Sequence, residues 1–447
     1  MKKVIFLCFI LMIIASLSAE NLITLEEAIE IAIENNLSLK SSYNNMQSSK
    51  WASTNAKTQL LPKLNFNETA ILYDKERVIM PEINLGSIVI PETKQDKKNF
   101  ISTLQLEQVL FAGGKLYNSS KISALQYQIS INNYEKKLKD LTAKVQEYYY
   151  QILKTQSSIE ILQNQKQLCE DIKNNAETLF NNGIGLETDV MQWELQVIQV
   201  ENQLIQLEAS YKLLLDSWSI LLGFESKYNN TLPKTIELDE IFAEVETYNS
   251  FTNSEKEQKL NEYLSKVKTT NYDIKNLENS KQSLNYLNRI SKADFMPSLF
   301  LNMNYEIEND NKLNLDGDNN WQIMANLSIP LFHSGSNYSN YQNQKYEIKS
   351  QMNLIEENVQ SLMIIAKQAW YDYDNAINSL KQANKSNIIA KRALELTHKL
   401  YLQGMTTNLS LTEAQNTNQT SELQFINSIY DYIIYKNNLN KFTGDVK

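Results

Sequence analysis

The sequence is short of residues that interrupt helices and of residues that build catalytic or metal sites. Its 447 residues include 10 glycines, 6 prolines, 2 cysteines and 2 histidines. With so few cysteines and histidines, the sequence has almost no residues from which to build a Cys/His metal site or a nucleophile–base pair. Cys8 lies in a segment that we expect to be removed, which leaves Cys169 without an intramolecular disulfide partner. We therefore expect no catalytic residue, no metal and no cofactor.

An excess of positive charge is also missing. The net charge is −9, and the lysines and arginines do not gather in a cluster. Nucleic-acid-binding proteins carry basic patches or stripes, so we expect no nucleic-acid partner.

Long apolar runs are rare, and the one that exists lies at the start. Val4–Ile14 is apolar, follows Lys2 and Lys3, and precedes the small-residue stretch Ala15–Ala19. This order is typical of a secretory signal peptide, and the run is shorter than the roughly 20 residues of a membrane-spanning helix. We predict that residues 1–19 are removed and that the mature chain is exported. If it enters a membrane, it must do so through β-strands.

Two stretches contain neither glycine nor proline. Lys115–Asn182 and Ser336–Gln403 are 68 residues each, long enough for helices of about 100 Å at about 1.5 Å per residue. In the second stretch, apolar residues alternate at spacings of four and three from Ile348 to Ala383. The equivalent positions of the first stretch, from Tyr127 to Leu162, are apolar in ten of eleven cases. A heptad repeat held this long predicts supercoiled helices.

The glycines and prolines also reveal a duplication. Gly114, Gly183 and Gly223 recur as Gly335, Gly404 and Gly444, all at an offset of 221, whereas Pro62 recurs as Pro297 at the larger offset of 235. The loop between the two strands is therefore longer in the first half, by the difference between these offsets. Before Pro62, the segment Thr24–Leu61 is predicted to be one helix, because Thr24 and Glu27 have the capping-box spacing and apolar residues follow at helical intervals.

Two further segments in each half alternate apolar and polar residues. The apolar positions run from Leu64 to Leu72, Phe100 to Leu110, Leu299 to Ile307 and Trp321 to Leu331. Strands of about ten residues with one apolar and one polar face match transmembrane β-barrels. The alternative is that the strands cover a soluble core, but the chain offers no compact core for them.

Each half is therefore predicted to contain a helix, two strands, a long helix, a turn and a shorter helix. We place the first repeat at residues 20–223, with strands within 62–111, and the second at 257–447, with strands within 297–332. Residues 224–256 form a polar surface connector. The predicted fold class is mainly α with a small β part: duplicated long coiled-coil helical hairpins form an α-barrel, and each chain adds four transmembrane β-strands.

Four strands cannot close a barrel, and lipid does not tolerate an open sheet edge. A barrel of about eight strands is filled by its own side chains, so a pore needs more. Three chains supply twelve strands, which makes a cyclic homotrimer the simplest closed assembly. The strand count excludes a monomeric channel, while the choice of three copies over four rests partly on a family resemblance.

The sequence resembles the TolC family of outer-membrane efflux proteins over essentially the whole mature chain. The motifs that carry the resemblance are Leu22–Ala28, Leu61–Leu64 with its echo Met296–Leu299, Gln108–Gly114 with Ile329–Gly335, Tyr149–Leu153, and the turns Phe180–Gly183 and Tyr401–Gly404. Each motif is weak alone, and their order, spacing and duplication together are specific. The family usually has proline where this chain has Leu37, which is a local departure.

The resemblance implies a trimer with a twelve-stranded barrel in the outer membrane and a helical tunnel in the periplasm. It implies a passive exit duct of a tripartite efflux or type I secretion system. The implied partners are outer-membrane lipid, a periplasmic adaptor (membrane fusion protein) and an inner-membrane pump of the RND, ABC or MFS type. Engagement of adaptor and pump would open the duct at its periplasmic end.

The resemblance also assigns residues. Asp189 and Tyr401 correspond to interhelix polar links at the periplasmic aperture, and Ser410 and Glu413 to positions of acidic rings. Gly183 and Gly404 mark the helix-hairpin tips that contact the adaptor. The family often has a basic residue after the second turn, where this chain has Thr406, so this chain departs from the family's charged latch.

Two other classes of function remain open from the sequence alone. An exported coiled-coil stalk or adhesin-like protein without a pore explains the long helices but not the four strands between them. An exported enzyme would need a Ser/His/Asp set, a metal cluster or a phosphate loop, and the sequence shows none of these.

Overall fold

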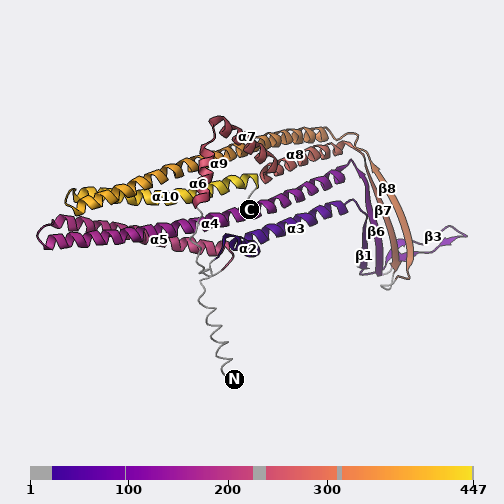
Figure 1. Ribbon diagram of the computed structural model, residues 1–447. Coiled ribbons are helices and arrows are strands. Elements are labelled where there is room, and N and C mark those ends of the chain that lie inside the picture. Colours follow the sequence, from indigo (N-terminus) through magenta and orange to yellow (C-terminus); the bar gives the residue numbers. More distant parts are fainter. Residues whose placement is uncertain (1–22, 96, 225–237, 310–314, 445–447) are drawn as a thin grey trace, which may run out of the picture. The chain divides into compact units, whose positions relative to one another are not determined.

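The computed structural model describes residues 23–95, 97–224, 238–309 and 315–444 (Figure 1). The predicted signal peptide and the first part of the predicted connector lie outside these residues. The described chain divides into two units: one takes residues up to 44, 132–275 and from 359 onwards, and the other takes 45–131 and 276–358.

The order of elements follows the duplication. The first half contains α2 (Leu25–Asn35), α3 (Leu37–Thr58), β1 (Lys63–Leu72), β2 (Arg77–Met80), β3 (Ile83–Asn84), β4 (Val89–Ile90), β5 (Thr93–Gln95), β6 (Lys98–Ala112), α4 (Lys115–Asn181) and α5 (Glu187–Leu221). The connector between the halves contains α6 (Leu238–Asn249). The second half contains α7 (Asn253–Thr270), α8 (Tyr272–Ile290), η1 (Ala293–Phe295), β7 (Ser298–Asn309), β8 (Asp318–Ser328), α9 (Ser336–Leu402) and α10 (Asn408–Thr443). This order confirms the predicted fold class of long helical hairpins and four long strands.

The long helices α4 and α9 are 67 residues each and match the stretches without glycine or proline. Each ends at a glycine in the left-handed region, Gly183 at φ 76° and Gly404 at φ 71°. The N–H of Ile184 then donates to the carbonyl of Leu179 at 3.0 Å, and the equivalent bond after Gly404 is 2.9 Å. This helix ending needs a residue with positive φ, which glycine adopts without steric penalty.

The first helix of each half is interrupted, which the sequence pattern does not predict. The helix expected over residues 24–61 breaks at Asn36 between α2 and α3, and α7 and α8 break in the same way at Asn271. In each case the Oδ1 atom accepts the N–H of the residue three positions on, at 3.1 and 3.3 Å. The Nδ2 atom of Asn36 donates to the carbonyl of Leu221 at 3.1 Å, and that of Asn271 to Phe442 at 3.3 Å. Two equivalent asparagines therefore cap one helix and bind the end of another.

The core of the first unit uses the predicted heptad positions. Val145 and Ile152 of α4 and Leu380 of α9 are fully buried. The predicted surface connector is partly core as well, because α6 buries Tyr248, whose ring lies 5.7 Å from that of Tyr373 on α9. Burial of such aromatic rings anchors α6 to the helical bundle.

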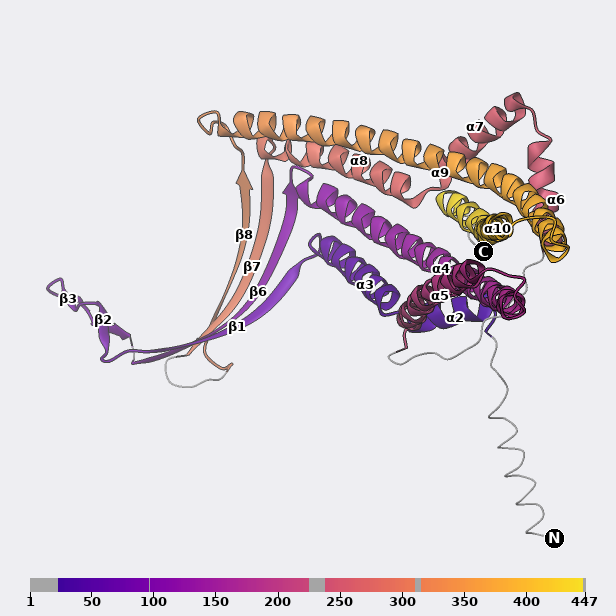
Figure 2. The same ribbon diagram turned by 90° about the vertical axis from the view of Figure 1, so that its left-hand side faces the viewer.

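The second unit contains an antiparallel sheet in the order β1-β6-β7-β8 (Figure 2). Its register places apolar side chains in rows on one face, including the row Leu64, Leu106, Met303 and Ile323 and the row Phe66, Leu104, Tyr305 and Trp321. The opposite face carries the row Asn65, Gln105, Asn304 and Gln322. Trp321 is 69% exposed and Leu64 64% exposed, so the apolar face has no cover within the described chain. β1 and β8 are the two edges of this sheet.

The additional length of the first half contains strands β2 to β5, which pair as two small two-stranded sheets. This hairpin continues beyond β1 and β6, away from the main sheet (Figures 1 and 2). The offset between the prolines locates the extra length but does not predict its strands. Within the described residues, no helix has the length and apolar character that crossing a membrane requires.

Candidate functional site at the helical turns

The α4–α5 turn and the α9–α10 turn lie at the same end of the first unit (Figure 1). Large apolar side chains project from both turns into solvent. Ile184 is 78% exposed and Leu186 65%, while Leu402 is 64% and Met405 72% exposed. Isolated exposed apolar residues are common, but a group of them at two neighbouring turns indicates a contact surface.

Asp189 and Tyr401, the two predicted link residues, both lie close to these turns. Asp189 is in the first turn of α5, where its carboxylate complements the positive end of the helix dipole. Burial raises the pKa of the Tyr401 hydroxyl, and the nearby Asp189 carboxylate raises it further. The structure therefore brings these two groups within electrostatic range, with Tyr401 remaining a neutral hydrogen-bonding group.

Asn408, at the start of α10, is the centre of the hydrogen-bond network beside the turns. The indole N–H of the fully buried Trp193 donates to its Oδ1 atom at 2.6 Å. The Nδ2 atom of Asn408 donates to Asp189 Oδ1 at 3.1 Å and to Gln192 Oε1 at 3.0 Å. Gln192 in turn donates to the hydroxyl of Thr412 at 3.2 Å. One neutral side chain of α10 thus joins three residues of α5.

Asn408 is not among the residues predicted from the sequence. The family resemblance directs attention to position 406 instead, where the family often has a basic residue and this chain has Thr406. An asparagine in the first turn of a helix usually acts as a local cap, so its sequence position alone does not indicate a contact with α5. Only the packing of α10 against α5 reveals that contact.

The two predicted ring positions have different surroundings. Ser410 lies in the cap of α10: its N–H donates to Thr407 Oγ1 at 3.2 Å, and the two hydroxyl oxygens are 3.0 Å apart. The side chain of Glu413 is exposed. One chain therefore presents a carboxylate to solvent at Glu413, whereas the Ser410 hydroxyl is occupied by capping.

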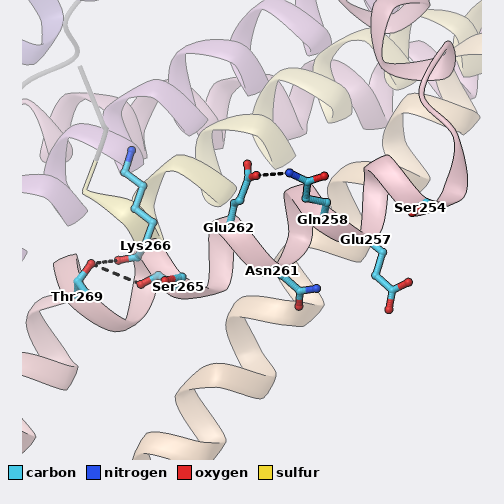
Figure 3. Close-up of a pocket in the computed structure, with 8 residues that line it drawn as sticks. All are labelled: Ser254, Glu257, Gln258, Asn261, Glu262, Ser265, Lys266 and Thr269. Carbon is cyan, nitrogen blue, oxygen red and sulfur yellow. Dashed lines mark hydrogen bonds between the residues drawn. The ribbon is translucent and has the colours of Figure 1, made fainter.

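A polar groove along α7 is a second concave surface (Figure 3). All its lining residues belong to this one helix: Ser254, Glu257, Gln258, Asn261, Glu262, Ser265, Lys266 and Thr269. Gln258 donates to Glu262 at 2.9 Å, and Thr269 donates to the carbonyl of Lys266 at 2.9 Å. Bonds between neighbouring turns of one helix are typical of a hydrated helix face, so we assign the groove no function. No group of three or more His, Cys, Asp or Glu side chains that could hold a metal occurs in the described part of the chain.

The model of the outer membrane efflux protein family matches residues 28–215 and 263–445. The chain belongs to this family. A search among curated proteins finds no significant match.

Solved channel structures share the fold. The CmeC outer membrane channel of Campylobacter jejuni matches with a TM-score of 0.78 and 18% identity, over 94% of this chain and 85% of the other. The open state of the MtrE outer membrane channel of Neisseria gonorrhoeae matches with a TM-score of 0.76 and 18% identity, over 95% and 89%. The outer membrane protein VceC of Vibrio cholerae matches with a TM-score of 0.76 and 14% identity, over 94% and 96%.

The family and the fold define an outer-membrane efflux channel protein whose helical part lies in the periplasm. The proteins that it resembles are channels rather than enzymes.

Proposed function

We propose that three copies of this chain form a passive exit duct across the periplasm and outer membrane, in a tripartite efflux or type I secretion system. The observation that carries the proposal is the sheet: it has an exposed apolar face, a polar face and two free edges. In lipid, such edges must be paired with another copy. The apolar face then contacts outer-membrane lipid, and the polar face lines the lumen.

The helices support the same assembly. Apolar side chains at spacings of four, three and seven are exposed along α5: Met191, Leu195, Ile198 and Ile205. This spacing is that of a coiled-coil seam without a partner in the described part of its own chain. A neighbouring copy would supply the missing helix.

The turns fit contact with a periplasmic adaptor that links the duct to an inner-membrane pump of the RND, ABC or MFS type. Gly183 and Gly404 expose the apolar residues around them, because each glycine reverses the chain at the end of a helical hairpin. We propose these tips as the adaptor contact. We also propose that the organisation into two repeats, 20–223 and 257–447, joined by residues 224–256, reflects this duplicated hairpin.

The aperture is proposed to lie beside these turns. Asp189 and Tyr401 would restrain the helices of one copy. Glu413, with the shorter Ser410 one turn before it, would face its counterparts in the two other copies. Three carboxylates around one axis repel each other, so bound cations would stabilise them.

Single-channel recording in planar bilayers tests this function. We expect the wild-type protein to form cation-preferring pores that divalent cations block from the periplasmic side. Glu413→Ala should reduce both the cation preference and the block, and the matched variant Glu194→Ala, which removes an exposed carboxylate of α5, should leave both in place. Absence of pores would refute the duct, and an unchanged Glu413→Ala pore would refute the carboxylate ring.

A further inference from the structure

The outer end of the sheet, the end farthest along the strands from α3 and α9, places two carboxylates directly opposite each other. Glu308, near the end of β7, pairs with Asp318, the first residue of β8. The same row continues through Ile101 to Thr69, so the pair lies on the polar face of the sheet. Directly opposed residues have Cβ atoms about 4.5–5.5 Å apart, and like charges at such positions repel each other. Both side chains are exposed, so a hydrated ion can reach them.

The backbone holds these two residues close together. Gly317, which precedes Asp318, lies against the backbone of Glu308, and a Cβ added to this glycine would overlap the Glu308 carbonyl oxygen. Any side chain at position 317 would therefore push β8 away from β7 at this point. The opposed carboxylates are thus a consequence of the register of the two strands.

Asn99 on β6 lies beside the two carboxylates. Its side chain is 2% exposed, and its Nδ2 atom donates to Glu308 Oε1 at 2.6 Å. Its Oδ1 atom is buried and has no hydrogen-bond partner in the described structure. Because both atoms belong to one amide group, Oδ1 lies next to the same carboxylate. A buried acceptor without a partner is unfavourable, and a bound water molecule or ion commonly satisfies such an atom.

No basic residue of the described strands lies near these carboxylates on the polar face. Glu306, one step before Glu308 on this face, adds a third carboxylate, and its partner on β8 is the neutral Asn320. Among the strand positions of this face, the one basic residue is Lys63, at the opposite end of β1. The outer end therefore combines uncompensated negative charge with a buried amide oxygen.

The chemistry of these groups indicates which ligand they would bind. Two carboxylates and an amide oxygen are the hard oxygen ligands that calcium and magnesium ions prefer. The scarcity of cysteine and histidine does not exclude such a site. Ca²⁺ accepts carboxylate and amide oxygens in a flexible shell of roughly 6–8 ligands, whereas Mg²⁺ demands a near-ideal octahedron. Ligands that come from three different strands meet the flexible requirement more readily.

We propose that Asn99 Oδ1 and the carboxylates of Glu308 and Asp318 bind a calcium ion at the outer end of the sheet, with water completing its shell. The ion joins β6, β7 and β8 and replaces the repulsion between the two carboxylates by attraction. Because the helical part lies in the periplasm, this end of the sheet faces the cell exterior. Calcium sites of extracellular modules have Kd values of about 10⁻⁴–10⁻³ M, and we expect a value in this range.

All three ligands belong to one chain. The inference therefore goes beyond the proposed function and does not depend on a duct of three copies. The expected effect of Ca²⁺ is local: it should stabilise the outer ends of β6, β7 and β8.

Hydrogen–deuterium exchange of the purified full-length protein in detergent tests the site, after bound metal has been removed with a chelator. Peptides that contain Asn99 or Glu308 should exchange more slowly when Ca²⁺ is added. With a Kd of about 0.5 mM and about 5 mM Ca²⁺, mass action predicts that local opening slows by about ten-fold. The same concentration of Mg²⁺ should slow exchange by less than about two-fold.

Two variants should change this response in opposite directions. Glu308→Gln keeps an acceptor for Asn99 but removes one charge, so the Ca²⁺ response should disappear, while exchange without Ca²⁺ should become slower than in the wild type. Asn99→Asp adds a third carboxylate, so exchange without Ca²⁺ should become faster and Ca²⁺ should bind about ten-fold more tightly. A purely structural role of these residues predicts no such reversal between the two conditions. The matched control Glu107→Gln removes an exposed carboxylate from the inner end of the same face and should respond as the wild type does.

The wild-type measurement alone can refute the site, so the test does not depend on a variant that folds. Unchanged exchange of the Asn99 and Glu308 peptides in Ca²⁺ would overturn the proposal and leave water as the partner of Asn99 Oδ1. Equal slowing by Mg²⁺ would overturn the assignment to calcium, and loss of the response in Glu107→Gln would overturn the choice of ligands. Pore formation in bilayers is measured on the same samples. Absence of pores with a normal Ca²⁺ response refutes only the duct, whereas normal pores without a Ca²⁺ response refute only the calcium site.

Discussion

Ser334 has a positive φ of 49°, and it is the residue equivalent to Gly113, whose φ is 59°. The left-handed conformation brings the Cβ of a residue with a side chain close to its own backbone and costs roughly 1–2 kcal/mol. Ser334→Gly should therefore raise the stability of the protein by about 1 kcal/mol. Thermal unfolding followed by circular dichroism at 222 nm in detergent checks this expectation.

The adjacent residue supplies the control. Gly335 has a φ of 79°, and a Cβ added there would meet nothing within 4 Å. Gly335→Ala therefore isolates backbone strain and should lower stability by about 1 kcal/mol. If both substitutions shift the unfolding temperature in the same direction, the conformational explanation of this turn is wrong.

Single residues differ in how far their sequence reveals their role. Gly183 and Gly404 were predictable, because a glycine that follows so long a stretch without one must end the helix. Asn408 was not, because its hydrogen-bonding partners Trp193 and Gln192 lie more than 200 positions away in the sequence. The role of a side chain that acts within one turn can be inferred from sequence spacing. The role of a side chain that acts between helices becomes visible only when the packing of those helices is known.

At the scale of elements, Asn36 and Asn271 determine where the first helix of each half is divided. Each side chain caps one helix and bonds the last turn of another. Asn36→Ala should lower stability by about 1–2 kcal/mol, because it removes the cap and leaves the Leu221 carbonyl without this donor. Asn271→Ala should have a similar effect, since its contacts are equivalent.

Chemical denaturation monitored by tryptophan fluorescence measures these changes, because Trp218 lies in the cluster beside α2 and the end of α5. Asn45→Ala, at an exposed position of α3, serves as control and should change stability by less than about 0.5 kcal/mol. Equal effects of Asn45→Ala and Asn36→Ala on stability would show that the Asn36 side chain at the helix break does not stabilise the protein.

The long elements could be predicted well from the sequence and the interruptions poorly, for a physical reason. A helix as long as α4 is specified by many repeats of one pattern, and a strand such as β7 is specified by several alternating positions. The break at Asn36 depends on one side chain whose bond to Leu221 spans 185 residues. The hairpin β2–β5 was located by its length, but its strands are only two to four residues long, too short to show a period.

At the scale of the whole molecule, the two free edges of the sheet and the exposed apolar seam of α5 both require a neighbouring copy of the chain. Ile205 is 65% exposed in one chain and would be buried against a neighbouring copy. Ile205→Glu places a charge where no partner is available, which costs several kcal/mol per interface. We expect the fraction of trimer to fall by at least about ten-fold.

Unheated gel electrophoresis of outer-membrane fractions measures that fraction, because an intact oligomer migrates more slowly than a single chain. The adjacent variant Gln206→Glu adds the same charge at an exposed position that is already polar, so it should still give the slow-migrating oligomer. If Ile205→Glu retains the oligomer, α5 does not form the subunit interface. If the wild-type chain itself runs as a monomer in the membrane fraction, then no assembly closes the edges of β1 and β8. The proposed duct would then be excluded, because a four-stranded sheet cannot enclose a lumen.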